Sequence, residues 1–346
     1  MQKKIIALAV AALASTAAFA QTNVTIYGIA DANFVANTYL GAAGKQTQYG
    51  INSGGLSTSR IGFKGVEDLG NGLKALFVLE YGLGIDGSNG IGYSTTTSAV
   101  ARQQFVGLTG GFGTAVAGHL QTTGLDFTVA GSALGGSTGL GVAHKGNGLQ
   151  AAAATHLISA LEGGRHSNAI AYISPSFGGL TVAYNHARVS ETAGTTGNTD
   201  SHGDLLSLSY ANGPLTAGAI YTRATMSGAN NNVTEWGLRG GYDFNVVKLQ
   251  AQYQTAKSQA LSLGSDNLWL LSATVPVGAK VAVIAEYAHN TVKSTAAKDN
   301  VHAATVAATY ALSKRTTAYA GITGKRVDNA KDGDSNAYLV GLRHMF

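Results

Sequence analysis

The C-terminal end of the chain alternates strictly between two faces, and this pattern constrains the fold more than any other feature. The residues of one parity are Tyr338, Val340, Leu342, His344 and Phe346. A period of two predicts a β-strand. The termini of soluble domains are usually frayed and polar, so a final phenylalanine is unusual there. A transmembrane β-barrel instead ties its end into the closing strand and places aromatic residues at the lipid interface. We therefore predict such a barrel.

Residues 1–20 have the layout of a cleavable export signal. Lys3 and Lys4 precede a short apolar run, and Ala18-Phe19-Ala20 precedes Gln21. A positively charged start, a short apolar run and small residues before the cleavage point are typical of secretory signals. An uncleaved anchor is less favoured, because a spanning helix needs about 20 apolar residues. We expect the mature chain to begin at Gln21 and to form a single domain over residues 21–346.

The composition favours a membrane protein without a spanning helix. Charged residues make up 12% of the chain, the cysteine count is 0 and the mean hydropathy is +0.09. Soluble domains have about 25% charged residues, so much of this surface should face something other than water. No window after the signal is apolar enough for a transmembrane helix, whereas a closed barrel pairs all of its backbone groups without edges. A secreted soluble β-sandwich is the remaining alternative.

Alternation inside the chain indicates which face of a strand meets lipid. In the segment 73–83 the odd positions are all apolar or aromatic, whereas the even positions include Lys74 and Glu80. One face should therefore meet lipid and the other water. The pattern is broken where Leu76 and Val78 point inward and Gln103 points outward. These positions could face a folded-in loop or a neighbouring subunit.

Seven short turns punctuate the chain, and their spacing predicts the number of strands. They lie at 68–72, 109–111, 174–178, 212–214, 243–245, 276–278 and 313–314. Each interval between turns can hold an upward strand, a long loop and a downward strand, which gives sixteen strands. The predicted fold class is all-β: a 16-stranded antiparallel transmembrane β-barrel with short periplasmic turns and long extracellular loops.

One interval is longer than its neighbours by about 25 to 30 residues, and its excess lies at about 120–167, in the third long loop. The segment is rich in glycine and alanine, so a mobile surface loop is one interpretation. A sixteen-stranded barrel is wide enough for an aqueous lumen, and a long loop at this position can fold inward and narrow it. We favour the inward loop.

Several motifs resemble the Gram-negative general porins, and among them the trimeric porins of the Neisseria and Burkholderia type. The matching stretches are Ser59 to Ala75, Arg102 with 106–108, 112–114, 168–175 with 177–179, and 341–346. The resemblance covers the whole chain and implies a homotrimer in the outer membrane, with loop 3 lining a constriction that passes ions and small hydrophilic solutes. In such a protein the C-terminal series from Tyr338 to Phe346 is expected to be the assembly signal for the barrel assembly machinery. The strand count above does not depend on this resemblance.

The cations expected in the lumen come from two strands. Arg60 and Lys64 share the inward parity of the second strand, and Arg102 and Gln104 share it on the fourth. Arg60 and Arg102 match positions at which the resembled porins form a basic cluster at the waist of the pore. Ordinary solvated wall charge is the alternative interpretation. Fixed charge in a narrow aqueous pore makes entry easier for ions of opposite sign.

Loop 3 supplies the opposing wall in such porins, usually with acidic side chains. Between residues 120 and 167 the only acids are Asp126 and Glu162, and Arg165 follows them in sequence. His119 stands where many relatives have an arginine, and a histidine titrates near pH 6.5 in the reference state. We therefore predict a moderate anion preference that rises as the pH falls.

Other classes of function are disfavoured by the sequence. There is no Gly-x-Ser-x-Gly elbow on a strand-to-helix turn, so an enzyme is not predicted. Histidines are scattered singly and cysteine is absent, so neither a metal nor another cofactor is expected. The basic residues are dispersed, which argues against a nucleic-acid partner. Two hypotheses remain: a water-filled channel for passive diffusion, and a structural or adhesive surface barrel with a largely closed lumen. Charged groups on the waist strands favour the channel.

Overall fold

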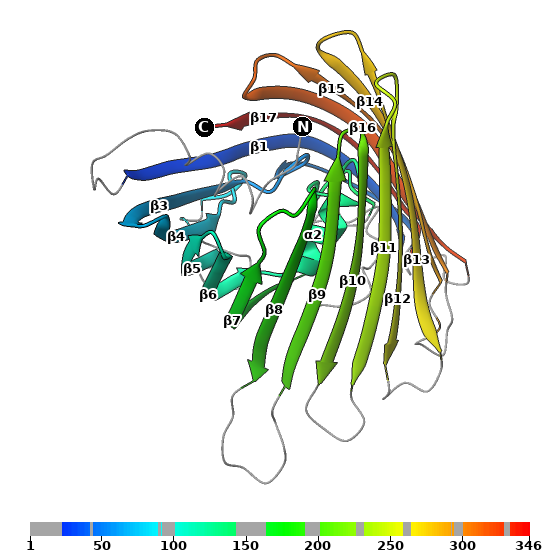
Figure 1. Cartoon of the computed structure of the whole chain (residues 1–346). Helices are drawn as coiled ribbons and strands as arrows, with labels where there is room; N and C mark the ends of the chain where they lie inside the picture. Colours follow the sequence, from blue (N-terminus) through cyan, green and yellow to red (C-terminus); the bar gives the residue numbers. More distant parts are fainter. Residues whose placement is uncertain are drawn as a thin grey trace.

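A computed structural model shows the chain as one continuous antiparallel sheet that curves into a barrel (Figure 1). The structure describes residues 23–41, 44–88, 91, 101–142, 164–190, 201–225, 232–258, 264–291, 293, 300–328 and 333–346. The expected signal at 1–20 and Gln21 lie outside the described residues. Among the described residues, no helix is long and apolar enough to span a bilayer.

The strands follow one another along the sheet in nearly the order of the sequence. They are β1 (Asn23–Gly41), β2 (Gly44–Ser53), β3 (Arg60–Gly70), β4 (Leu73–Gly82), β5 (Ala101–Gly110), β6 (Gly113–Gln121), β7 (Arg165–Ile173), β8 (Leu180–Ser190), β9 (Ser201–Asn212), β10 (Leu215–Thr225), β11 (Val233–Asp243), β12 (Lys248–Ser258), β13 (Ser265–Val277), β14 (Val281–Thr291), β15 (Val301–Ala311), β16 (Thr316–Val327) and β17 (Ser335–Met345). Helix α2 (Thr123–Ala130) lies between β6 and β7 in sequence, on the inner side of the curved sheet in Figure 1.

The predicted number of strands is confirmed, because two of the 17 strands share one position in the barrel. The first part of β1 (23–29) pairs with β3, whereas its later part (32–41) pairs with β2. β2 and β3 are therefore one barrel strand that is interrupted by residues 54–59. On its other side β1 pairs with β17 from Ile29 opposite Met345 to Tyr39 opposite Ser335, which closes the barrel.

The seven predicted turns connect neighbouring strands as expected. The turn between β3 and β4 shows how the sequence favours these turns. Its two central residues, Asn71 and Gly72, have positive φ angles of 52° and 78°. A two-residue turn with positive φ at both positions matches the twist of the flanking strands, and asparagine followed by glycine is the pair that adopts it most readily. These short connections fix the register of each hairpin.

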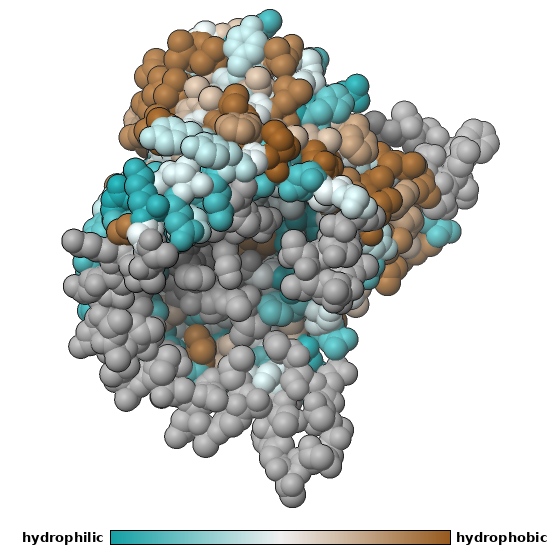
Figure 2. All heavy atoms as spheres, turned by 180° about the vertical axis from the view of Figure 1, so that it is seen from behind, coloured by the Kyte–Doolittle hydropathy of each residue, from teal (hydrophilic) through white to brown (hydrophobic). Residues whose placement is uncertain are grey.

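The outer wall is apolar and much of the inner wall is polar. Val106, Leu238 and Val306 point outward and are 62%, 53% and 59% exposed, whereas Gln254 and Glu286 point inward and are 0% and 4% exposed. Figure 2 shows broad hydrophobic areas on the outer surface. Exposed apolar area on this scale suits a lipid solvent rather than water.

The terminal strand has the predicted parity. Tyr338, Val340 and Leu342 are all on the outer face and are about half exposed. His344 Nδ1 lies 2.9 Å from Thr316 Oγ1 on β16. Phe346 continues the pairing beyond β17, because its backbone exchanges hydrogen bonds of 3.0 and 3.1 Å with Gly28. The end of the described chain is thus part of the seam and not a frayed tail.

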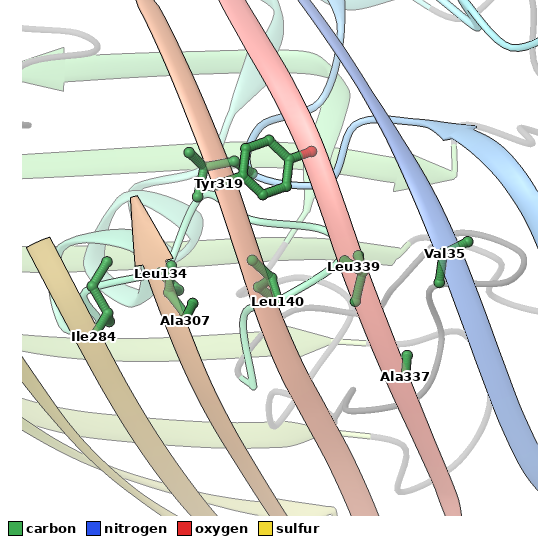
Figure 3. Close-up of a cluster of buried hydrophobic side chains, with 9 residues drawn as sticks. Val35, Leu134, Leu140, Ile284, Ala307, Tyr319, Ala337 and Leu339 are labelled. Atoms are coloured by element: carbon green, nitrogen blue, oxygen red, sulfur yellow. The ribbon is translucent and has the colours of Figure 1, made fainter. Parts of the chain in front are cut away.

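The segment after β6 folds into the barrel, which confirms the inward loop 3. Its described part, up to Val142, packs along the inner wall instead of leaving it. Leu134 and Leu140 are buried in a cluster with wall residues that include Ile284, Tyr319 and Leu339 (Figure 3). Val142 joins a second cluster formed by residues of β13, β14 and β15. Residues 143–163, and with them Glu162, lie outside the described residues.

Candidate functional site

Glu80 is the centre of a charged group on the inner wall. Arg102 Nε donates to its Oε1 at 2.7 Å, and Arg60 Nη1 lies 3.8 Å from the same oxygen. The hydroxyl of Tyr27 donates to Glu80 Oε2 at 3.1 Å. The side chains of Arg60, Arg102 and Glu80 are 12%, 11% and 4% exposed. The charge-assisted hydrogen bond from Arg102 and the ion pair with Arg60 hold the two guanidinium groups beside Glu80.

The register of β1, β3 and β4 explains why these groups meet. Tyr27 lies opposite Gly62, and Gly62 lies opposite Glu80. A Cβ atom at Gly62 would come within 2.4 Å of the Tyr27 ring, so only glycine leaves room for the ring to cross this strand toward Glu80. Because Gly62 has no side chain, Tyr27 on β1 can reach Glu80 on β4.

A β-bulge in β5 directs Arg102 inward. Tyr81 pairs with Ala101 and Glu80 pairs with Gln103, so Arg102 is the extra residue. A bulge places two residues opposite one and can re-aim a side chain. The expected inward position of Arg102 is therefore confirmed, but the inward position of Gln104 is wrong. Gln104 pairs with Leu79 on the outer face and donates to the Tyr81 hydroxyl at 3.0 Å, while Gln103 is the inward residue.

His119 was also expected in the lumen, and the register places it on the outer wall. It pairs with Gln104, and its Nδ1 lies 3.0 Å from Ser167 Oγ. The residues on either side of it, Gly118 and Leu120, point inward, and Leu120 is 3% exposed. The alternation of β6 therefore turns the imidazole away from the water-filled side, and His119 cannot act as a pore-lining charge.

Loop 3 and the start of β7 add a second charged group to the lumen. Arg165 Nη2 donates to Gln121 Oε1 at 2.9 Å, and Gln121 Nε2 donates to Asp126 Oδ1 at 2.5 Å. Asp126 lies in the first turn of α2, whose N-cap is Thr122; its hydroxyl accepts from Leu125 N at 3.1 Å. An acid in the first turn is favoured by the helix dipole.

Asp126 is the acid of this group whose protonation changes near neutral pH. Burial raises its pKa to about 6, against the opposing effects of the Gln121 hydrogen bond and of the positive charges of Arg165 and Arg239. Burial has this effect because it penalises the charged carboxylate more than the neutral acid. Arg165 also interacts electrostatically with Arg60 and Arg102, so the two charged groups face one region of the lumen.

We define the arginine cluster as Arg60, Arg102 and Arg165. Lys64 lies nearby: it pairs with Thr25 and Val78 on the inner face, and its Nζ is 5.2 Å from the centroid of the Tyr27 ring. The expected inward side of Lys64 is therefore confirmed. The cluster together with Lys64 carries four positive charges, against the two acids Glu80 and Asp126. An arrangement of this kind creates a positive potential in a narrow aqueous space.

Loop 3 is held in place by two acids of the wall that were not singled out from the sequence. The carboxylate of Asp31 accepts hydrogen bonds from the backbone of Gly55, Leu56 and Ser57 at 3.1, 2.9 and 2.6 Å. This network folds residues 54–59 inward, where the Gly55 carbonyl accepts from Ser137 Oγ at 2.6 Å and from Gly139 N at 3.0 Å.

The second acid is Glu286 on β14. Its Oε1 accepts from Leu134 N at 2.8 Å and also from the Ser132 hydroxyl, and its Oε2 accepts from Val142 N at 3.4 Å. The alternation in 73–83 already places Glu80 on the water-facing side, and inward parity alone would also have identified Glu286 as a lumenal acid. Their partners are 20 to 154 residues away in sequence, so the contacts themselves have no local signal.

Comparisons with known proteins agree with this geometry. A family model described as Gram-negative porin matches residues 7–331. Outer membrane porin protein 32 of Delftia acidovorans is 34% identical over 375 residues, and the major outer membrane protein P.IB of Neisseria lactamica is 32% identical over 370 residues; both alignments cover 100% of each chain. The anion-selective porin from Comamonas acidovorans has a similar structure, with a TM-score of 0.73, 27% identity and coverage of 94% of this chain and 100% of that one.

Proposed function

The chain belongs to the Gram-negative porin family, and from this premise we propose that its outer-membrane diffusion channel prefers anions because of the arginine cluster. The role of the channel and its place in the outer membrane follow from the family and the barrel. The selectivity and the residues responsible for it are our proposal.

The observation that carries this proposal is the excess of fixed positive charge around Glu80. One carboxylate contacts two guanidinium groups, and Arg165 adds a third on the loop 3 side. Fixed charge at the narrowest part of an aqueous pore favours ions of the opposite sign. The anion-selective name of the Comamonas acidovorans protein, whose structure this chain resembles, gives independent support.

The test is the reversal potential of the purified protein in a planar bilayer under a salt gradient. We expect anion preference in the parent and its loss in the double variant Arg60→Ser with Arg102→Ser. Lys314→Ser with Arg315→Ser is the matched control, because it removes two exposed cations from the short turn between β15 and β16. An unchanged reversal potential in the Arg60 and Arg102 variant would mean that other residues determine the ion selectivity. The absence of conductance from folded protein would instead favour the structural or adhesive barrel.

The remaining proposals concern partners and processing. We propose a homotrimer that passes small hydrophilic solutes and anions, has no enzymatic activity, and is assembled through its C-terminal residues by the barrel assembly machinery. We also propose removal of residues 1–20. Intact mass of protein from the outer membrane tests cleavage before Gln21, and mass photometry in detergent tests the trimer. A monomeric mass, or retention of residue 1, would contradict the corresponding proposal.

A further inference from the structure

A row of polar and charged side chains crosses the outer face of five neighbouring strands. The register places His186 on β8 opposite Asp204 on β9, and Asp204 opposite Arg223 on β10. It continues through Thr234 on β11 to Lys257 on β12. We call these five residues the rim row. It lies at the ends of the strands joined by the long loops, which is the extracellular side of the barrel.

The rows beneath it show that the rim row stands at the edge of the lipid-facing surface. Two residues closer to the short turns, the same strands carry Tyr184, Leu206, Tyr221 and Trp236 in register, with exposed fractions of 37%, 46%, 48% and 43%. Tyrosine and tryptophan mark the boundary between lipid and water in membrane proteins. Two residues of a strand span about 7 Å, so the rim row is at the depth of the lipid headgroups.

The rim row has an excess of positive charge that faces outward. Arg223 and Lys257 are exposed, and neither forms an ion pair with another described residue. The one acid, Asp204, already accepts from the Tyr184 hydroxyl at 2.6 Å and contacts His186 Nδ1 at 2.9 Å. One step further from the membrane, Arg188 pairs with His202 and adds another cation.

We propose that the rim row binds the phosphate groups of a phosphorylated glycolipid in the outer leaflet. Arg223 and Lys257 are two strand spacings apart, about 10 Å, so they can contact two phosphates on one sugar headgroup. Guanidinium groups bind phosphate through paired hydrogen bonds, and lysine acts as a point charge. His186, Thr234 and the Tyr184 hydroxyl supply hydrogen-bonding groups for the sugar beside them. The acyl chains of such a lipid would lie on the aromatic and apolar rows below.

The experiment measures lipid binding by the purified full-length protein in detergent, using native mass spectrometry with added diphosphoryl lipid A. The test variant is Arg223→Gln with Lys257→Gln. Lys280→Gln with Lys314→Gln is the control, because it removes two exposed cations from short turns at the opposite end of the barrel. Each cation near an anionic headgroup contributes about fivefold, so we expect roughly thirty-fold weaker binding in the test variant alone. The parent should also bind lipid A without phosphates much more weakly.

Three results would overturn the proposal: equal binding by the test variant and the parent, an equal loss in the control, or binding that does not depend on the phosphates. A change in oligomeric state in the test variant would also overturn it, because the rim row would then contact a second copy of the chain. The reversal potential should stay at the parent value in both variants, so the outcome is separate from that of the proposed anion preference.

Discussion

Glu80 sets how much positive charge the arginine cluster presents to the lumen. It contacts both Arg60 and Arg102, and its side chain is 4% exposed. A carboxylate in this position offsets part of the positive potential and also holds the two guanidinium groups against the wall. We therefore expect selectivity to depend on a balance among three side chains and not on the number of arginines alone.

Replacing Glu80 by glutamine should strengthen anion preference while keeping the shape of the side chain. One charge about 5 Å from an aqueous path contributes up to roughly 1 kcal/mol, so the anion-to-cation permeability ratio should rise about two- to fivefold. The reversal potential under a salt gradient measures this ratio. Glu67→Gln is the matched control, since Glu67 is exposed on the outer face of the same hairpin. A decrease in the ratio would show that Glu80 acts mainly by positioning the arginines.

Asp126 should make the selectivity of the channel depend on pH. Its pKa is raised to about 6 by burial, so the carboxyl is charged above pH 6 and neutral below it. As the pH falls from 7 to 5 the lumen loses one negative charge, and anion preference should rise. The direction is the one predicted from the sequence, but we assign the effect to Asp126 and not to His119, which faces outward.

Reversal potentials of the parent and of Asp126→Asn between pH 7 and 5 test this assignment. The variant should show the low-pH selectivity at both pH values. The raised pKa also means that the folded position of loop 3 is more stable when Asp126 is protonated. This stabilisation is complete at a pH below the ordinary carboxyl pKa, and it is lost as the pH rises through about 6. A pH step that persists in Asp126→Asn would assign the effect to another group.

Among the structural elements, loop 3 depends on the interruption between β2 and β3. Residues 54–59 leave the sheet because Asp31, which is 0% exposed, accepts from three consecutive backbone amides and from the Tyr319 hydroxyl at 2.5 Å. Two hydrogen bonds to the Gly55 carbonyl, from the Ser137 hydroxyl and the Gly139 amide, then join Gly55 to loop 3. Loop 3 is therefore attached to Asp31 on the seam strand β1, through residues 54–59, as well as to Glu286 on β14.

Asp31→Asn should weaken this attachment. The amide has one acceptor oxygen in place of two, and its NH2 group would face backbone donors, so about two charge-assisted hydrogen bonds are lost. Such bonds contribute about 1.5 to 3 kcal/mol each, which gives a free energy of unfolding roughly 3 to 6 kcal/mol lower. Denaturant unfolding in detergent measures it. Tyr319→Phe removes one of the four hydrogen bonds to Asp31, and it should lower the free energy of unfolding by about 1 to 3 kcal/mol. A smaller effect of Asp31→Asn than of Tyr319→Phe would contradict this account.

For the molecule as a whole, the features that follow from local patterns could be predicted from the sequence. The seven turns, the sixteen strands and the outward face of Tyr338, Val340 and Leu342 depend on turn chemistry and on a period of two, both of which are local. The inward fold of loop 3 followed from its length in a barrel of this width.

The errors in the site have separate causes. Gln104 was placed inward because alternation was counted from Arg102, and a bulge at Arg102 changes the parity of every later residue of β5. His119 was assigned by its position relative to a glycine and not by the face of β6. The attachments of loop 3 to Asp31 and Glu286 join residues far apart in sequence, and no local pattern specifies them.

The pairing of β1 with β17 also constrains the order in which the strands of the barrel can assemble. Among the described strands β1 is the first in the sequence and β17 is the last, yet the two are hydrogen-bonded neighbours from Ile29 to Tyr39. During assembly of the barrel, therefore, one edge of β1 has no strand partner until β17 has joined the sheet. Every intermediate that lacks β17 is a sheet with two open edges, which is the form most prone to pair with other chains. Closure of the ring is the last step, and until then something other than the barrel itself must protect both edges.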